Sequence, residues 1–321
     1  MVLEQKLNIK TPSILTPIHS ATFYDRKVQC LLKRDDLIHP VISGNKWRKL
    51  KYQLLSHRAS NKNCIISFGG AWSNHLHALG YCCKQLDIQL QVYIRGEVSK
   101  KPSKMIQDLL QWGVKVHYLD RAQYRLKDTA QFLKQMELAF PTATIIPEGG
   151  SHLLAIKGVV EMVSELPHDV DYFCMAVGSG GTIAGSLVGL KGNCKIIGIP
   201  VVNAYEDIQQ RIRTLLAYEN KDPKQIQNIM DKMDLIDGFH RGGYAKVDIE
   251  LAEFIKLFHT QNNVILEPIY TGKLCLAITH LAQQGYFKPH QKIVILHSGG
   301  LQGLRGMNKF ELDSWYQSMV N

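Results

Sequence analysis

Lys46, which follows glycine and asparagine in "VISGNKWRKLKYQL", is a residue that could do covalent chemistry. A lysine amine attacks carbonyl groups when its surroundings keep it uncharged. Arg48, Lys49 and Lys51 follow on the same predicted helix, although the charges do not form one stripe, so a solvated basic helix, with or without a nucleic-acid backbone along it, is the alternative. Gly44 favours the chemical interpretation, because glycine permits a close backbone approach that a surface helix does not need.

A glycine-rich run, "AVGSGGTIAGSL", follows an apolar segment and opens a predicted helix. Its residues that could face a ligand are Gly178, Ser179, Gly180, Gly181 and Thr182. Glycines let backbone N–H groups approach an anion closely, and a helix N-terminus carries roughly half a positive charge. The run lacks the Lys-Ser/Thr of a Walker A loop and the acidic residue of a dinucleotide fingerprint. It therefore predicts either a phosphate site or a tight strand-to-helix turn.

A second predicted helix start lies in "GGAWSNHLHALG", where Ser73, Asn74 and His75 combine a hydroxyl, an amide and exposed N–H groups. These groups could bind a carboxylate, or Ser73 or Asn74 could cap the helix without a ligand. His75 and His77 face different sides of a helix, so they make a poor metal pair. The sequence has no CxxC pair either, and no metal is expected.

Two loops near the C-terminus complete the set of candidates. Tyr270 and Thr271 lie in "EPIYTGK", and Ser298 follows His297 in "HSGG". Either loop could carry a site or form a simple turn. We interpret His297 as a packed histidine rather than a general base.

The segments that must position these residues alternate short β-branched runs with helix-length amphipathic stretches, the rhythm of a parallel α/β sheet. The predicted strands are "CIISF", "LQVYIR", "VKVHYL", "TIIPEGG", "YFCMAVG", "KIIGIPV", "VILEPIY" and "KIVILHSGG". The predicted helices begin at about Ser73, Pro102, Leu126, Thr182, Ala204 and Gly272, with one more over "VDIELAEFIKLFHT". Because open α/β sheets bind ligands beyond the carboxyl ends of their strands, the loops could converge on one crevice.

Composition bounds the class of protein. The chain has 321 residues, 45% hydrophobic and 21% charged, which is long enough for two globular domains. Its formal net charge of +10 favours anionic ligands, but the lysines spread through both halves, which argues against a nucleic-acid-binding face. The N-terminus lacks a signal-like apolar core, no run is long enough to span a membrane, and several of the seven cysteines lie in apolar runs, so we expect a cytoplasmic protein.

Seven motifs, taken in order, resemble the pyridoxal-phosphate enzymes related to tryptophan synthase β, which have fold type II. These motifs are "LLKRDDL", "SGNKWRKL", "SFGGAWSNH", "IPEGGSH", "VGSGGT", "EPIYTGK" and "HSGG". Within that group the sequence resembles the 1-aminocyclopropane-1-carboxylate deaminase and D-cysteine desulfhydrase family, from about residue 31 to about residue 305. The resemblance implies two α/β domains with open twisted parallel sheets. Residues 50–160 would form a smaller domain inserted between residues 1–49 and 161–321 of a larger, cofactor-binding one, in a homodimer.

The resemblance also implies that pyridoxal phosphate is the cofactor and that Lys46 forms a Schiff base with its aldehyde, later acting as a base near Cα. The glycine-rich run would hold the phosphate, and Asn74 would lie by the ring hydroxyl. Thr271 and Ser298 would stand beside the pyridine nitrogen, where the deaminases carry glutamate and leucine. A carboxylate there keeps the ring a strong electron sink, whereas two hydroxyls do so far less. The hydroxyl pair resembles the desulfhydrases.

For the substrate, the resemblance places Ser73, Asn74 and His75 at the carboxylate. Tyr270 would lie near the reacting carbons, with Tyr244 of "RGGYAKVD" as a second active-site tyrosine. The expected reaction is α,β-elimination from a small D-amino acid, D-cysteine first, which yields an α-keto acid, ammonia and sulfide.

Two departures from the family pattern keep alternatives open. Trp72 stands where these enzymes usually have glutamine, and His77 stands where they usually have arginine. Both would flank the carboxylate site, so the identity of the amino acid is open. The alternatives are deamination of 1-aminocyclopropane-1-carboxylate and a catalytically silent relative that only binds the cofactor.

Overall fold

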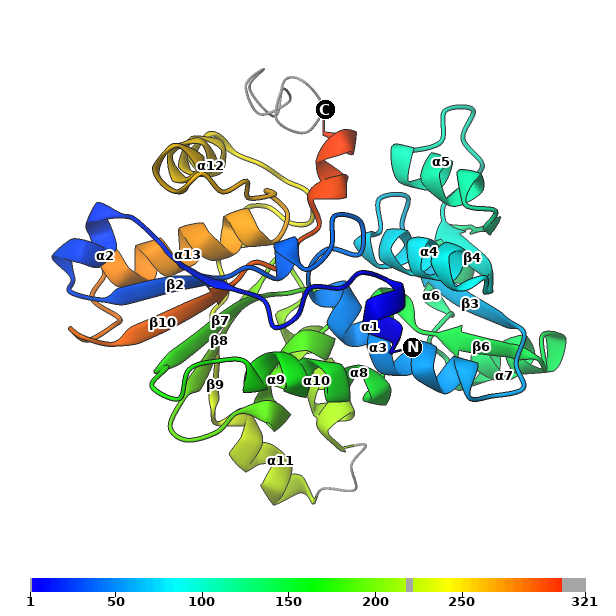
Figure 1. Cartoon of the computed structure of the whole chain (residues 1–321), viewed down its shortest axis with the longest axis horizontal. Helices are drawn as coiled ribbons and strands as arrows, with labels where there is room; N and C mark the ends of the chain where they lie inside the picture. The colour runs from blue at the N-terminus through cyan, green and yellow to red at the C-terminus, as the bar shows by residue number, and fades with distance from the viewer. Residues whose placement is uncertain (1, 218–221, 308–321) are drawn as a thin grey trace.

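The computed structural model describes residues 2–217 and 222–307. These residues form two separate sheets, each with helices on both of its faces (Figure 1). Every strand pair but one is parallel. The predicted α/β class with open parallel sheets is therefore confirmed.

The larger sheet has six strands in the order β1-β2-β10-β7-β8-β9, and only β1 runs antiparallel to its neighbour. The strands are β1 (Leu15–Pro17), β2 (Gln29–Lys33), β7 (Tyr172–Val177), β8 (Lys195–Pro200), β9 (Met233–Leu235) and β10 (Lys292–Leu296). One face packs against α2 (Ala21–Asp25), α12 (Ile249–Asn262) and α13 (Thr271–Gln283). The other face packs against α8 (Leu153–Ser164), α9 (Gly181–Gly189), α10 (Tyr205–Ala217) and α11 (Pro223–Met230).

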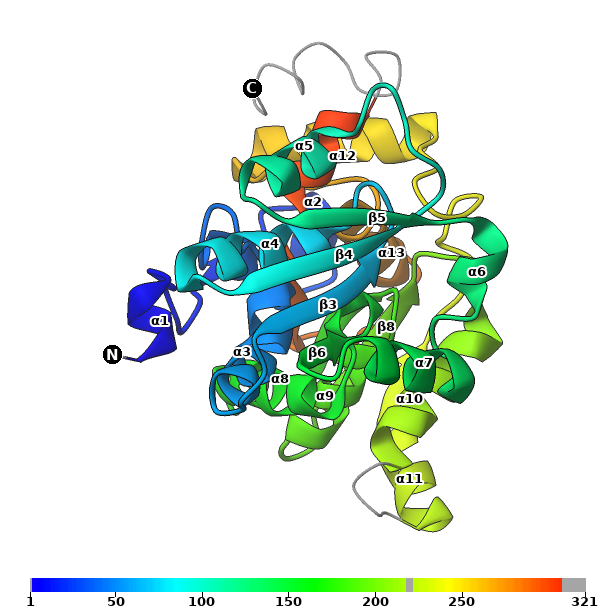
Figure 2. The ribbon, with the colours of Figure 1, turned by 90° about the vertical axis from the view of Figure 1, so that its right-hand side faces the viewer.

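The smaller sheet has four parallel strands in the order β5-β4-β3-β6, which lie side by side in Figure 2. The strands are β3 (Cys64–Gly69), β4 (Gln89–Arg95), β5 (Lys115–Leu119) and β6 (Ala143–Ile146). Helices α4 (Asn74–Leu86) and α5 (Lys104–Gln111) cover one face, and α6 (Arg121–Arg125) and α7 (Ala130–Ala139) lie by the other. Every residue of β3 is buried, as expected of a central parallel strand.

Helix α3 (Asn45–Arg58) connects the two halves of the molecule. Trp47, Leu50 and Leu54 recur at helical spacing and pack into the core beside the smaller sheet, together with α1 (Leu3–Lys6). The opposite side of α3 lies against α8, where a Cβ on Gly158 would overlap the carbonyl oxygen of Arg48. The predicted domain division, between residues 49 and 50, falls inside α3 and stays a prediction.

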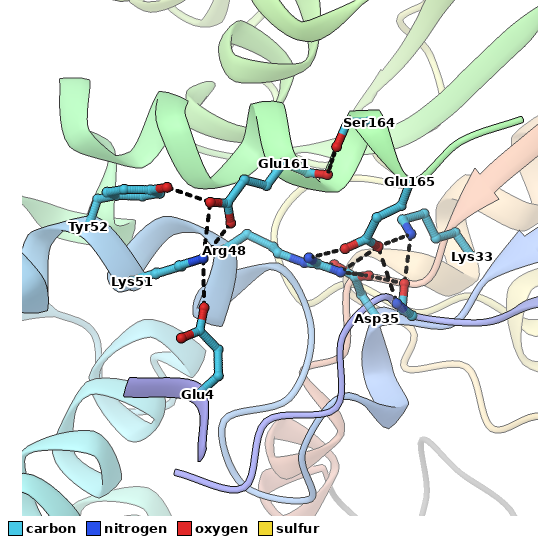
Figure 3. A network of polar contacts seen from close by, with 10 residues as sticks. Glu4, Lys33, Asp35, Arg48, Lys51, Tyr52, Glu161, Ser164 and Glu165 are labelled. Atoms are coloured by element: carbon cyan, nitrogen blue, oxygen red, sulfur yellow. Dashed lines mark hydrogen bonds and ion pairs between the residues drawn. The ribbon is translucent and has the colours of Figure 1, made fainter. Parts of the chain in front are cut away.

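Buried ion pairs also fix α3 (Figure 3). Arg48 donates to both oxygens of Asp35, at 3.1 Å each, and to both oxygens of Glu165, at 2.6 and 2.9 Å. Asp35 lies in the turn η1 (Asp35–Leu37), and Glu165 directly follows α8. Lys33 on β2 donates to the same Glu165 at 2.6 Å. The network therefore links α3 to elements of the larger sheet.

The run "VILEPIY", predicted as a strand, is not one, and this prediction is wrong. Pro268 has no N–H, and the N–H groups of Ile269, Tyr270 and Thr271 all donate to the Glu267 carboxylate instead of to a neighbouring strand. The helix predicted from about Leu126 also begins later, at α7.

None of the helices in the described part of the chain has the length and apolar character that a membrane span needs.

Candidate active site

Loops from both sheets meet at the N-terminus of α3. Gly44, with φ of +76°, precedes the helix, and a Cβ there would overlap the carbonyl oxygen of Ser298 in the loop after β10. Asn45 N donates to the same oxygen at 3.3 Å. A Cβ on Gly178, in the loop after β7, would lie 3.3 Å from Cε1 of Tyr270. The predicted convergence of these loops is therefore present in the structure.

Lys46 is half-buried at the start of α3, and its Nζ donates to Asn45 Oδ1 at 2.6 Å. Burial lowers the pKa of Lys46 to about 8, although the negative charge of Glu267 opposes the change. Asn45 Nδ2 in turn donates to Thr182 Oγ1 at 2.9 Å. The Asn45 side-chain amide thus connects Lys46 to the glycine-rich run. Among the described residues, no carboxylate lies within ion-pair distance of Lys46.

Lys49, one turn along α3, lies against the glycine-rich run. Only 2% of its surface is exposed, and its Nζ donates to Ser151 Oγ at 2.9 Å and to Ser179 Oγ at 3.3 Å. Burial, and then the charge of Lys46, holds the pKa of Lys49 well below its ordinary value. Arg48 is also only 2% exposed, so the solvated basic helix, the alternative for this segment, is wrong for both residues.

The surroundings of Lys49 fit a phosphate group. Gly180, with φ of +83°, precedes α9, whose first-turn N–H groups have no intrahelical acceptor. A Cβ on Gly181 would lie 3.1 Å from Lys49 Nζ, so the ammonium lies directly at this helix end. Because Thr182 Oγ1 accepts from Asn45, its own proton is free to donate outward. A lysine amine, a hydroxyl and a helix N-terminus are groups that bind phosphate in other proteins, and the phosphate site stays a prediction here.

The start of α4 shows a helix cap and a contact with the C-terminal loop. Ser73 Oγ accepts from Leu76 N at 3.2 Å, which confirms the cap but leaves carboxylate binding a prediction. Asn74 Oδ1 accepts from Gln302 Nε2 at 2.6 Å. Gln302 lies in the turn η3 (Leu301–Gly306), and a Cβ on Gly300 would lie 2.5 Å from Asn74 Nδ2. Asn74 is therefore held beside the loop that carries Ser298.

His75 is a neutral interior histidine. Ser67 Oγ donates to Ile146 O at 2.9 Å, so it must accept from His75 Nε2 at 2.8 Å, and the proton lies on Nε2. Burial, and then the charges of Lys49 and Lys46, lowers its pKa well below the ordinary value. An uncharged ring cannot attract a carboxylate by charge, so any contribution of His75 to that site would come from its backbone N–H.

Trp72 and His77, the two departures from the family pattern, pack against η3. His77 Nε2 lies 3.0 Å from Asp108 Oδ2, and Arg305 Nη2 donates to the same oxygen at 2.6 Å. A Cβ on Gly306 would overlap the ring of Trp72. Both side chains therefore have a structural role in holding η3 against α4 and α5.

Glu267 organises the start of α13. Its carboxylate accepts from the backbone N of Ile269, Tyr270 and Thr271 at 2.6–3.0 Å, and from Thr271 Oγ1 at 3.0 Å. Burial raises the pKa of Glu267 to about 7, although these hydrogen bonds oppose the change. The Thr271 hydroxyl proton is thus directed at Glu267. If Thr271 stands beside the ring nitrogen of the cofactor, as expected, its hydroxyl could accept a hydrogen bond from that nitrogen but could not donate one.

The structure brings the two candidate tyrosines together. The rings of Tyr244 and Tyr270 lie 6.2 Å apart, edge to face, and each hydroxyl affects the pKa of the other. Burial raises the pKa of both hydroxyls, so both stay protonated near neutral pH.

His297 has the structural role expected of it: Nε2 donates to Ile265 O at 2.8 Å, and Nδ1 accepts from Gly299 N at 3.2 Å.

Four residues of this region were not among the predicted ones: Asn45, Lys49, Ser151 and Glu267. Glu267 lies four positions before α13, outside the N-cap position held by Tyr270, so the run "EPIYTGK" carries no recognised capping signal for it. The remaining contacts join segments far apart in the chain, which no local pattern shows. Within residues 2–217 and 222–307, no group of three or more His, Cys, Asp or Glu is placed to hold a metal ion.

Comparisons with known proteins identify the family. The family described as pyridoxal-phosphate dependent enzymes matches residues 9–299. A Pyrococcus furiosus protein named "Putative 1-aminocyclopropane-1-carboxylate deaminase" is 30% identical over 282 residues, 85% of this chain and 84% of that protein. The Arabidopsis thaliana "Bifunctional D-cysteine desulfhydrase/1-aminocyclopropane-1-carboxylate deaminase, mitochondrial" is 28% identical, over 90% of this chain and 77% of its own length.

A solved structure agrees with these relatives. The crystal structure of an "ACC deaminase homologue" superposes with a TM-score of 0.77 at 25% identity, and covers 94% of this chain and 95% of its own. The likeness thus extends over most of the chain. The chain therefore belongs to the pyridoxal-phosphate dependent enzymes, and pyridoxal phosphate is its cofactor.

Proposed function

We propose that this chain catalyses α,β-elimination from a small D-amino acid, with D-cysteine as the first candidate. The observation that carries the proposal is Lys46, an amine with a pKa of about 8 that is connected through Asn45 to the predicted phosphate site. Such an amine is partly uncharged near neutral pH, as a nucleophile and a base must be. When bound here, pyridoxal phosphate supplies an electron sink for the bonding pair left at Cα.

Residues of the described site would divide the work of holding the cofactor. Lys49, Thr182 and the N–H groups of the glycine-rich run would bind its phosphate. Lys46 would bond covalently to its aldehyde. Asn74, fixed by Gln302, would lie by the ring hydroxyl, and Ser298 would lie at the ring nitrogen.

The proton transfers follow from the same side chains. Lys46 Nζ would take the proton from Cα, and the Cβ–S bond would break with its electron pair on sulfur. Tyr270, whose ring packs on that of Tyr244, would deliver a proton to the leaving sulfur. Backbone N–H groups at the start of α4 would hold the carboxylate. The aminoacrylate released would take up one water molecule, giving pyruvate and ammonia.

The choice of D-cysteine rests on Thr271. This residue is uncharged, and its hydroxyl proton is directed at Glu267, so it would not keep a ring nitrogen protonated. Expulsion of sulfide, a good leaving group, needs a weaker electron sink than opening a cyclopropane ring. The Arabidopsis relative, whose name includes D-cysteine desulfhydrase, supports this choice. Deamination of 1-aminocyclopropane-1-carboxylate is the second candidate, and the name of the Pyrococcus relative favours it.

Turnover of a small panel of amino acids tests the proposal. The purified enzyme with its cofactor is offered D- and L-cysteine, D- and L-serine and 1-aminocyclopropane-1-carboxylate, and the keto acid and sulfide are measured. We expect D-cysteine to have the highest kcat/KM, by about 10-fold or more, a difference of roughly 1.4 kcal/mol in transition-state binding. A higher value for the cyclopropane amino acid would favour the second candidate. No turnover at all would favour a relative that only binds the cofactor.

Changing Thr271 and Ser298 tests the electron-sink argument. Thr271→Glu with Ser298→Leu is expected to raise the ratio of 1-aminocyclopropane-1-carboxylate turnover to D-cysteine turnover, because the new carboxylate would protonate the ring nitrogen. Thr271→Gln with Ser298→Leu is the matched control, since glutamine has nearly the same shape without the charge. Equal ratios in the two double variants would refute the argument.

The homodimer and the cytoplasmic location remain proposals drawn from the sequence.

A further inference from the structure

Lys273, in the first turn of α13, is a buried lysine that the proposed reaction does not use. None of its surface is exposed, and among the described residues it has no carboxylate within ion-pair distance. It also lies at the positive end of a helix, where a cation is unfavourable. Burial lowers the pKa of Lys273 to about 8, although the charges of Glu267 and Asp248 oppose the change, so a charged amine here needs hydrogen-bond acceptors.

The acceptors are two backbone carbonyls of a single loop. Lys273 Nζ donates to His240 O at 2.7 Å and to Gly243 O at 2.8 Å. Each carbonyl also closes a turn: His240 O accepts from Gly243 N at 3.0 Å, and Gly243 O accepts from Lys246 N at 3.3 Å. Two consecutive turns that share Gly243 therefore point their carbonyls at one ammonium.

Tyr244 lies inside the second turn. It is 46% exposed, yet its ring packs edge to face on the ring of Tyr270. The neighbouring residues need unusual backbone: φ is +119° at Gly243 and +58° at Ala245. At Ala245, which has a Cβ, such a left-handed conformation persists only where surrounding contacts determine it. At the surface the loop is also held by Arg241, which pairs with Asp248 and Glu250.

We infer that Lys273 is a positioning residue, whose ammonium fixes the two turns that hold Tyr244 against Tyr270. The inference deepens the proposed function and rests on it for its catalytic part, because Tyr244 matters to turnover only if Tyr270 transfers a proton. The holding of the turns is a separate statement about the fold. Two measurements keep these parts distinguishable.

The first measurement is the rate at which trypsin cuts after Arg241 in the enzyme with its cofactor, followed by mass spectrometry. Lys273→Met keeps the length of the side chain but removes its donors, and should accelerate this cut by about 10-fold or more, because the turns open more often. Lys273→Arg keeps donors for both carbonyls and should cut more slowly than Lys273→Met, even if the methionine variant folds poorly. Lys292→Met, which removes the partner of the exposed Asp169, is the control and should cut at the wild-type rate. Equal rates for wild type, Lys273→Met and Lys273→Arg would overturn the inference.

The second measurement is a double-mutant cycle with Tyr244→Phe, on whichever of D-cysteine and 1-aminocyclopropane-1-carboxylate the wild type turns over faster. Lys273→Met should lower kcat by about 10- to 100-fold with little change in KM, as the loss of an aligned proton donor would. In the Tyr244→Phe background the same change should have almost no further effect, because its target is already gone. Independent, multiplicative losses would overturn the catalytic part. The trypsin result needs no substrate, so it decides on the turns even if neither amino acid is turned over.

Discussion

Replacing Lys46 by alanine is expected to lower kcat for D-cysteine by about 10³-fold or more, because the change removes both the nucleophile and the base of the proposed reaction. With a pKa of about 8, roughly one Lys46 amine in ten is uncharged at pH 7, against about one in 3,000 for an ordinary lysine. Covalent uptake of pyridoxal phosphate by cofactor-free wild type should therefore accelerate with pH and level off above about 8. Stopped-flow absorbance measures the uptake, and a coupled pyruvate assay measures kcat.

Lys49 is the matched control for Lys46, since it is a second buried lysine one turn away on the same helix. Its amine contacts the serines beside the glycine-rich run, so Lys49→Met should weaken the binding of pyridoxal phosphate by about 10- to 100-fold. At saturating cofactor its kcat should stay much closer to the wild-type value than that of Lys46→Ala. A Lys49→Met enzyme without turnover, beside a nearly normal Lys46→Ala enzyme, would reverse the two assignments.

Arg48→Met is expected to lower the free energy of unfolding by about 3–5 kcal/mol, the usual effect of removing one partner of a buried ion pair. Burial alone would raise the pKa of Glu165, but the hydrogen bonds and charges of Arg48 and Lys33 hold it below its ordinary value. Without Arg48 (Figure 3), the carboxylates of Asp35 and Glu165 would keep Lys33 and Ser13 as their polar partners in the described part of the chain. Urea unfolding at saturating cofactor, with the m-value unchanged, measures the loss.

Lys51→Met provides the comparison for Arg48→Met on the same helix. Lys51 pairs with Glu4 and Glu161, but all three side chains keep contact with water, so its removal should cost only about 0–1 kcal/mol. Glu165→Gln in the Arg48→Met background should restore part of the stability, because it removes one of the uncompensated charges. Equal losses for Arg48→Met and Lys51→Met would contradict the structural role given to the Arg48 network.

The sequence patterns that repeat locally predicted most of the fold. β-branched runs such as "CIISF" and "KIIGIPV" are strands, and the helices predicted at Ser73, Thr182 and Gly272 begin within one residue of those positions. The glycine at 44 correctly indicated a close backbone approach, because its partner, the carbonyl of Ser298, leaves no room for a Cβ. The strand predicted over "VILEPIY" is absent, because apolar residues can be buried without pairing in a sheet. The backbone N–H groups of Ile269 and Tyr270 donate to the Glu267 carboxylate instead of to a neighbouring strand.

The environments of the buried basic residues depend on contacts between segments far apart in the chain, so no local sequence pattern could predict them. Arg48 and Lys49 are neighbouring basic residues in the sequence, with nothing to tell them apart. In the structure, Arg48 pairs with carboxylates, whereas Lys49 contacts serines from two distant loops. Their separation into different environments depends on how α8 and the glycine-rich run lie across α3. Lys273 is likewise an ordinary lysine in the sequence, and only the folded loop at His240 and Gly243 gives it partners.

The most direct test of the central claim is to find which lysine carries the cofactor. The enzyme is loaded with pyridoxal phosphate, treated with borohydride and digested, and the modified peptide is sequenced by mass spectrometry. We predict that the pyridoxyl group is fixed on Lys46 in wild type and in Lys49→Met, and that Lys46→Ala shows no specific labelling. A label on Lys49, or a protein that takes up no pyridoxal phosphate, would contradict the account.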